Sequence, residues 1–196
     1  MIIKLGFAMT SSFCTFEEVI KQMELLVKLG YEVIPIGSPS VIECNTRFGE
    51  GEYFKNKIED ITNRKIVIDL AEAEKFGSIE PLDILVVAPA TGNFIGKLAN
   101  GITDNTVNMA AKATLRNGKP VVIGISTNDG LGLNGQNLMK LLNSKNIYFV
   151  PFGQDDHQKK PNSLVAHYDL LIPTIEEALF NKQYQPVIKE KIKKKD

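Results

Sequence analysis

The residues of this chain with the greatest chemical potential lie in four short polar segments. Each segment follows an apolar run that is typical of a buried strand, and the four cover residues 9–15, 37–40, 88–105 and 126–135. In an open parallel sheet, ligands bind beyond the carboxyl ends of the strands. We therefore expect the four segments to meet at one edge of a sheet and to form a ligand site there.

The first two segments carry hydroxyl groups that suit an anion. Thr10, Ser11 and Ser12 precede a predicted helix, whose N-terminal N–H groups favour negative charge. Ser38 and Ser40 follow the second predicted strand and would lie at the same end of the sheet. The glycines of a G-x-G-x-x-G dinucleotide loop are missing, which favours a terminal monophosphate over a pyrophosphate. A plain helix cap and a Ser-Pro-Ser turn are the alternative interpretations.

The other two segments offer polar groups to a flat ligand. Ala90, Thr91 and Asn93 form a tight turn directly after a buried strand. The Asn93 amide has both a donor and an acceptor, which suits the edge of a heterocycle or a carboxylate. Ser126 and Asn128 precede several glycines that would allow close approach of a ring. A capped strand-to-helix turn and a surface loop remain the alternatives for these segments.

The elements that must position these residues alternate along the chain. Short apolar runs predict strands over residues 2–8, 31–36, 65–68, 83–88, 121–125 and 147–150. Helical periodicity predicts helices between Thr15 and Gly30 and over residues 53–61, 95–98, 105–115, 136–142 and 175–180. Thr15 is the expected N-cap and Gly30 the left-handed end of the first helix, and residues 37–51 are expected to be a loop. This alternation predicts an α/β fold with three layers, α/β/α, and a Rossmann-like parallel sheet.

Length and composition limit the functional classes. The chain has 196 residues, of which 43% are hydrophobic, and this length suits a single domain. We expect one α/β domain over residues 1–181 and a polar, basic tail over 182–196, with five lysines in the last eight residues expected to be frayed. The formal net charge is zero, which argues against nucleic acid as a partner.

Cysteine content and hydropathy give the expected setting. Cys14 and Cys44 are too few for a disulfide framework or a zinc site, so we expect no metal and a reducing, cytoplasmic environment. We expect Cys14 to be a buried small side chain rather than a reactive thiolate. Residues 1–6 do not read as the start of a signal peptide, and no apolar stretch approaches the roughly 18 residues of a membrane span.

Three of these segments resemble a known family. Residues 10–12, 89–93 and 97–105 are similar to the flavoprotein family of small FMN-binding decarboxylases and prenyltransferases, whose members carry a Pro-Ala-Ser/Thr-Ala-Asn-Thr turn followed by Lys-x-Ala-x-Gly-x-x-Asp-Asn. The resemblance covers most of residues 2–150 and implies a flavoprotein-like sheet. It also implies FMN as cofactor, bound by Thr10, Ser11, Ser12, Ser38, Ala90, Thr91, Asn93 and Ser126, with the phosphate at the serines and threonine of the first two loops.

The chain departs from the decarboxylases of this family in two respects. Gly92 and Phe94 replace the Ala and Thr that flank the asparagine of the turn. The histidine that the decarboxylases carry after the first phosphate loop is absent, since His157 and His167 lie far downstream. Cysteine-decarboxylase chemistry is therefore not expected.

A narrower resemblance is longer and more specific. Residues 45–52, 109–117, 124–129, 131–135, 145–155 and 160–163 are similar to the B subunits of a two-subunit oxidoreductase of spore-forming bacteria. This resemblance implies two-electron oxidation of a dihydropyridine dicarboxylate in the mother-cell cytoplasm, with an A subunit that resembles nucleotide-binding dehydrogenases. The hydride acceptor would be FMN on this chain or NAD(P) on the partner, and a homo-oligomer within the complex is expected. A flavin-free subunit that only shapes the partner's site is the alternative.

A substrate with two carboxylates directs attention to arginine and amide side chains. A guanidinium binds a carboxylate through two parallel hydrogen bonds. Arg47, Asn93 and Asn128 are the predicted substrate-binding residues, whereas Arg116 is expected to interact with the end of its own helix. Both histidines are expected to be solvated, and the sequence assigns no general base.

Overall fold

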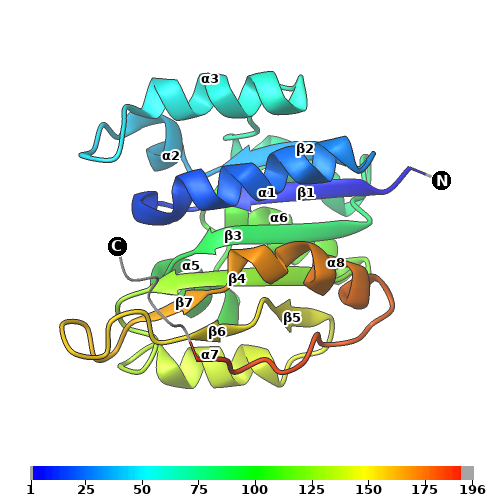
Figure 1. The fold of residues 1–196 in the computed structure, drawn as a ribbon. Helices are drawn as coiled ribbons and strands as arrows, with labels where there is room; N and C mark the ends of the chain where they lie inside the picture. Colours follow the sequence, from blue (N-terminus) through cyan, green and yellow to red (C-terminus); the bar gives the residue numbers. More distant parts are fainter. Residues whose placement is uncertain (1, 191–196) are drawn as a thin grey trace.

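The computed structural model describes residues 2–190, which fold around one twisted sheet (Figure 1). Its strands are β1 (Lys4–Met9), β2 (Glu32–Gly37), β3 (Ile84–Ala90), β4 (Val121–Thr127), β5 (Ile147–Phe149), β6 (Phe152–Gly153) and β7 (Leu164–Ala166). The strand order is β2-β1-β3-β4-β7-β6, and β5 also pairs with β4. Pairing is parallel among β1 to β5, whereas β7 runs antiparallel to both β4 and β6.

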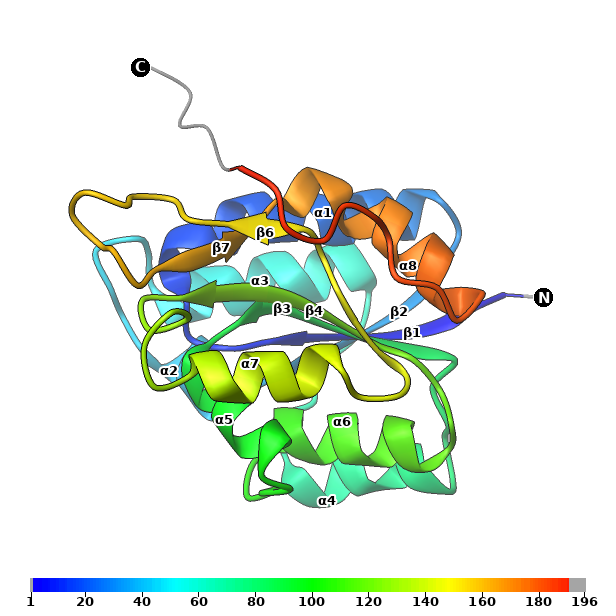
Figure 2. The same ribbon diagram turned by 90° about the horizontal axis from the view of Figure 1, so that it is seen from below.

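Helices cover both faces of the sheet, so the predicted three-layer α/β/α class is confirmed. The sheet is mixed rather than wholly parallel, because β7 runs antiparallel to its neighbours. They are α1 (Phe16–Lys28), α2 (Pro39–Glu43), α3 (Gly51–Thr62), α4 (Leu70–Glu74), α5 (Gly92–Ala99), α6 (Thr106–Arg116), α7 (Gly135–Leu142) and α8 (Leu171–Leu179). Figure 2 shows α1, α3 and α8 on one face and α4 to α7 on the other. Every residue of β3 is buried, which explains the unbroken apolar run that predicted this central strand.

Local sequence signals locate several of the helix boundaries, and the structure corrects others. The helices predicted over residues 95–98 and 175–180 begin earlier, at Gly92 and Leu171, and α4 was not predicted. Gly30 ends the first helical segment with φ of +89°, as predicted. The Thr15 side chain does not cap α1; its hydroxyl donates to the Ser12 carbonyl instead. Residues 37–51 are not all loop, because Pro39 begins the short helix α2. Residues 65–68 form no strand, since only Val67 bridges to β2 before the Asp69 cap starts α4.

The chain beyond α8 lies along the edge of the sheet. The Gln183 side chain accepts a hydrogen bond from the Phe149 N–H (2.8 Å) and donates one to the Phe149 carbonyl (2.7 Å). Ile188 then bridges to Phe152 in β6. The part of the predicted tail up to residue 190 therefore pairs with the sheet, and residues 191–196 lie outside the described residues. Within residues 2–190, no helix has the length and apolar character that crossing a membrane requires.

Candidate functional site

The four predicted polar segments do meet at one edge of the sheet. Strands β1, β2, β3 and β4 run parallel to one another, so their carboxyl ends lie side by side, on the left in Figure 1. Two hollows open there. One, the edge cavity, has about 540 Å³ and is lined by the loops after β1, β3 and β4, by residues 46–48 and by the β6–β7 connection. The other, the small pocket, has about 160 Å³ and is lined by the loops after β1, β2 and β3.

The small pocket is rich in hydroxyl groups. The hydroxyl of Ser40 lies 2.5 Å from that of Ser11 and 2.9 Å from that of Ser38, so the loops after β1 and β2 meet as predicted. Asn93 and Lys97 line the same pocket. The Lys97 ammonium pairs with Asp104, which offsets part of its charge. The pocket therefore presents several O–H donors and one partly neutralised cation.

Thr10 holds the two central strands together beneath this pocket. Its side chain is almost fully buried, donates to the Pro89 carbonyl at 2.7 Å and accepts from the Thr91 N–H at 3.0 Å. Thr91 in turn caps α5 by accepting from the Phe94 N–H. Ala90 is fully buried and lines neither hollow, so its side chain is not placed to touch a ligand. Thr10 and Ala90 thus position the loops around them.

Ser12 and Ser126 line the edge cavity, although 114 positions separate them in the sequence. Their hydroxyl oxygens lie 2.7 Å apart, and Ser126 is buried. Tyr168, which is completely buried behind β4, donates towards the carbonyls of Gly124 and Ile125. Burial raises the pKa of the Tyr168 phenol, so it remains a protonated donor at neutral pH. This support fixes the end of β4 and with it the Ser126 hydroxyl.

A tight turn brings Arg47 to the rim of the edge cavity. The Thr46 N–H donates to the Gly49 carbonyl and the Gly49 N–H donates back to Thr46. Gly49 has φ of +146°, a conformation that L side chains rarely adopt. The Arg47 guanidinium lies 4.8 Å from the centre of the Phe48 ring, and both residues line the cavity. No carboxylate within residues 2–190 forms an ion pair with Arg47.

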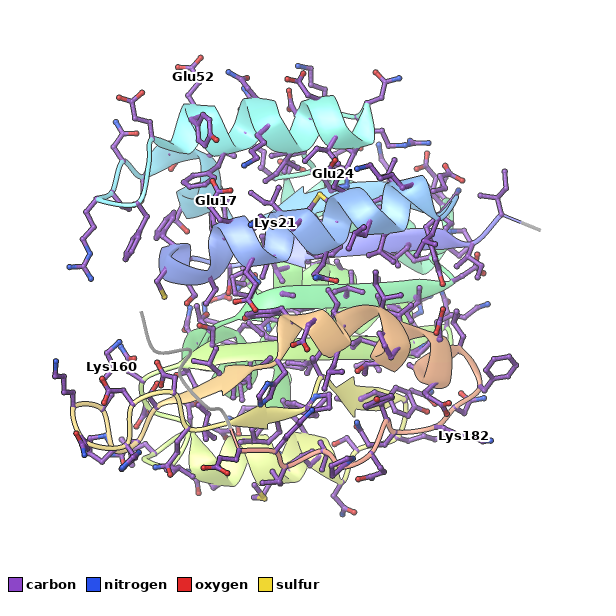
Figure 3. All side chains as sticks on the ribbon, in the orientation of Figure 1. Glu17, Lys21, Glu24, Glu52, Lys160 and Lys182 are labelled. Atoms are coloured by element: carbon purple, nitrogen blue, oxygen red, sulfur yellow. The ribbon has the colours of Figure 1, made fainter. Side chains whose placement is uncertain are left out.

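The opposite wall contains residues to which the sequence assigned no role. Asp155, Lys160 and Ser163 come from the connection between β6 and β7, and Figure 3 shows Lys160 on this connection at the same end of the molecule. The Ser163 hydroxyl donates to Asp155 Oδ1 at 2.5 Å, and Ser163 is only 1% exposed. Lys160 makes no ion pair among the residues that the structure describes. The polar run after residue 153 could have indicated a functional loop. The strands on either side of it are too short to show periodicity, so the sequence did not place this loop at the sheet edge.

The predicted site residues divide between the two hollows. Ser11 and Thr91 line both; Ser12, Arg47, Ser126 and Asn128 line the edge cavity; Thr10, Ser38 and Asn93 line the small pocket. The three predicted substrate residues are therefore not brought together, because Asn93 lies in a different hollow from Arg47 and Asn128. Asn93 lines the small pocket since it stands in the first turn of α5, beside the loop after β2.

The remaining sequence expectations have mixed outcomes. Cys14 is exposed and lines the edge cavity, so its predicted burial is wrong. His157 is exposed, as expected, and lines a separate hollow of about 870 Å³ that shares only Asp155 with the edge cavity. His167 is not simply solvated, because its Nε2 is buried without a hydrogen-bond partner in residues 2–190. Arg116 lies in the last turn of α6, where a cation is favourable.

Comparison with known proteins agrees with this architecture. The family model described as Flavoprotein matches residues 2–161. The chain belongs to the Flavoprotein family. This confirms the resemblance that the loops after β1 and β3 indicated.

Among members of the Flavoprotein family, the narrower resemblance is also confirmed. The chain is 55% identical over 187 residues to the B subunit of dipicolinate synthase from Bacillus subtilis (strain 168), and the match covers 95% of this chain and 94% of that protein. A crystal structure of the dipicolinate synthase B subunit from Bacillus halodurans C superposes with a TM-score of 0.89 at 55% identity, over 98% of this chain and 100% of that one.

More distant Flavoprotein relatives share the fold. The FMN-dependent cysteine decarboxylase SpaF matches 91% of this chain and 95% of its own, with a TM-score of 0.65 at 21% identity. At that identity the likeness shows the fold alone. The relation to the two dipicolinate synthase chains is much closer in both sequence and structure.

Proposed function

We propose that this chain works as the B subunit of a dipicolinate synthase. Together with an A subunit it would oxidise dihydrodipicolinate by two electrons to pyridine-2,6-dicarboxylate. The observation that carries the proposal is the edge cavity, where Arg47 and Lys160, two cations without carboxylate partners among the described residues, stand on different loops. The 55% identity to two such B subunits supports it.

The cavity suits a planar dicarboxylate. Its volume of about 540 Å³ is adequate for a small-molecule site, which typically has roughly 300–1,000 Å³. The Arg47 guanidinium would bind one carboxylate, and the Lys160 ammonium would bind the other as a point charge. The Phe48 ring would cover the apolar face of the substrate, and Asn128 would hydrogen-bond at its edge. These contacts would orient the substrate ring and shield one of its faces from water.

The donor set at the sheet edge fits FMN. The hydroxyls of Ser11, Ser38 and Ser40 in the small pocket suit a phosphate, which accepts hydrogen bonds on every terminal oxygen. Ser11 and Thr91 line both hollows, so one ligand can extend from the small pocket into the edge cavity. Asn93 would then contact the phosphate end, and Ser12 and Ser126 the ring end. FMN supplies a hydride acceptor when it is bound.

A second candidate function rests on the same hydroxyl groups. Ser11 already lies within hydrogen-bond distance of Ser40, and Ser12 within that of Ser126. Because these side chains satisfy one another, the loops need no ligand to be stable. The chain could thus serve as a flavin-free subunit that shapes the substrate site, and the acceptor would be a nicotinamide on the partner. Decarboxylation is disfavoured, because neither described histidine lines the edge cavity.

Assembly and setting complete the proposal. We propose that the chain forms a homo-oligomer within its complex with the A subunit, and that this complex works in the mother-cell cytoplasm of a sporulating bacterium. Size measurement of the purified chain, with and without its partner, tests the assembly.

The testing experiment combines spectroscopy with reconstitution. The visible spectrum of the purified chain is recorded and FMN is titrated in, first alone and then with the partner present. Dipicolinate formation from dihydrodipicolinate is then measured with and without FMN. A flavin band and FMN-dependent turnover would support the proposal with FMN as acceptor. Turnover that needs this chain but no flavin would support the second candidate, and no turnover with either acceptor would refute both.

A further inference from the structure

The proposed reaction needs a proton acceptor, and the sequence assigned none. Oxidation of the dihydro ring removes one hydrogen as a hydride and a second as a proton. The group that takes the proton must lie within reach of the ring. We infer that Asp155 is this acceptor, an assignment that rests on the proposed function of the edge cavity.

The composition of the cavity wall directs the choice to Asp155. Within residues 2–190 it is the only carboxylate that lines the edge cavity, and no histidine of these residues lines it. The other titratable groups in the wall are Cys14, Arg47 and Lys160. The two cations are protonated at neutral pH and cannot accept a proton. A carboxylate oxygen has lone pairs that accept a proton and is a common general base, so Asp155 is the candidate in this wall.

The geometry around Asp155 leaves one oxygen free for this task. The Ser163 hydroxyl donates to Oδ1 at 2.5 Å, and the burial of Ser163 fixes that donor. No hydrogen bond from residues 2–190 reaches Oδ2, and no cation of these residues pairs with the carboxylate. One oxygen is therefore anchored while the other keeps its acceptor capacity. Ser163 is a positioning residue in this arrangement.

The step balances in atoms and electrons. The C–H bond at one saturated ring carbon breaks, and its electron pair leaves with the hydrogen as hydride to a flavin or nicotinamide. The C–H bond at the other saturated carbon breaks towards Asp155, and its electron pair becomes a ring double bond. Asp155 gains one proton, which it returns to solvent after the product has left. The ring is aromatic after loss of two electrons and two hydrogens.

The test compares neighbouring aspartates in the assembled complex. Asp155→Asn keeps the size of the side chain but removes the base, and we expect kcat to fall about 100-fold or more. We expect KM to stay the same or fall, since a negative charge near the substrate carboxylates is lost. Asp156→Asn is the matched control, because Asp156 lines only the separate hollow. Its kcat is expected to stay within about threefold of wild type.

Three further readouts separate a base from a structural residue. The wild-type complex should lose kcat as the pH falls and a carboxylate base becomes protonated, and Asp155→Asn should lack this limb. Added formate should raise the activity of Asp155→Ala, because it can replace the missing carboxylate. It should not raise the activity of the wild type or of Ser163→Ala. Dipicolinate binding by calorimetry should be retained in both Asp155 variants, which verifies that they fold.

Each outcome decides the matter. A kcat for Asp155→Asn within threefold of wild type, or an unchanged acid limb, would overturn the assignment while leaving the proposed function intact. If the wild-type complex forms no dipicolinate with FMN and NAD(P) supplied, the proposed function fails and the assignment fails with it.

Discussion

Replacement of Arg47 by alanine is the sharpest test of the edge cavity. The guanidinium pairs with no carboxylate of residues 2–190, so it has no ion pair to lose and is available to the substrate. A hydrogen-bonded charge contact is worth about 1.5–3 kcal/mol. Because Arg47 is accessible to solvent, we take the lower part of that range, about 1.5–2 kcal/mol, which corresponds to a rise in KM of about 10- to 30-fold.

The same substitution should leave the fold almost unchanged. The guanidinium contacts the Phe48 ring, and such exposed contacts are worth about 0.5–1 kcal/mol. The free energy of unfolding should therefore change by less than about 1 kcal/mol. We also expect kcat to be little affected, because substrate and transition state both carry the carboxylates.

The assay is steady-state formation of dipicolinate by the reconstituted complex, with KM for dihydrodipicolinate as the readout. Arg64→Ala is the matched control, since Arg64 pairs with Glu32 at the start of β2, away from the carboxyl edge. Arg47→Lys should give an intermediate KM, because it keeps the charge but not the bidentate contact. If KM in Arg47→Ala equals that of the wild type and of Arg64→Ala, Arg47 does not bind substrate.

Three further predictions concern the cofactor pocket, the core and a half-exposed ion pair. Ser11→Asp should abolish FMN binding in a fluorescence titration, because its carboxylate would repel the phosphate. Gly124→Ala should lower the free energy of unfolding by about 1–3 kcal/mol in urea, since the new Cβ would lie 2.9 Å from the Tyr168 ring. Burial acts to raise the pKa of Asp83, but its hydrogen bonds, one of them from Lys119, outweigh burial and leave the pKa below its ordinary value. Its contribution to stability is therefore present above about pH 4 and lost as the pH falls through the folded-state pKa, so the deficit of Asp83→Asn should shrink below that pH.

Each of these predictions has a result that contradicts it. Ser78→Asp is the control for Ser11→Asp, because Ser78 precedes β3 and does not line the small pocket. Equal FMN affinity in the two variants would show that Ser11 does not contact the phosphate. A Gly124→Ala protein as stable as wild type would show that Tyr168 can move aside. A deficit of Asp83→Asn that does not vary between pH 7 and pH 3 would rule out the carboxylate as its source.

Periodicity within the chain was sufficient to predict the layered fold and the edge that carries the site. Unbroken apolar runs such as β3 arise where both faces of a strand are covered, so their alternation with amphipathic helices specifies an α/β/α sandwich. Parallel strands bring the segments that follow them to one edge, which is why the serines after β1 and β2 could be placed together. These features are local to a segment or to a pair of segments, and a single sequence contains that information.

The division and completion of the site depend on contacts that form only in three dimensions. Strands β6 and β7 have two and three residues, which is too few to show a period. They form because β5 pairs only with the first part of β4 and leaves Ser126 and Thr127 free to pair with β7. Their connection brings Asp155 and Lys160 into the cavity that Arg47 also lines. The assignment of Asn93 to one hollow and Asn128 to the other likewise depends on which loops face each other across the sheet edge. Such contacts join residues far apart in the chain, 114 positions for Ser12 and Ser126, and no local pattern records them.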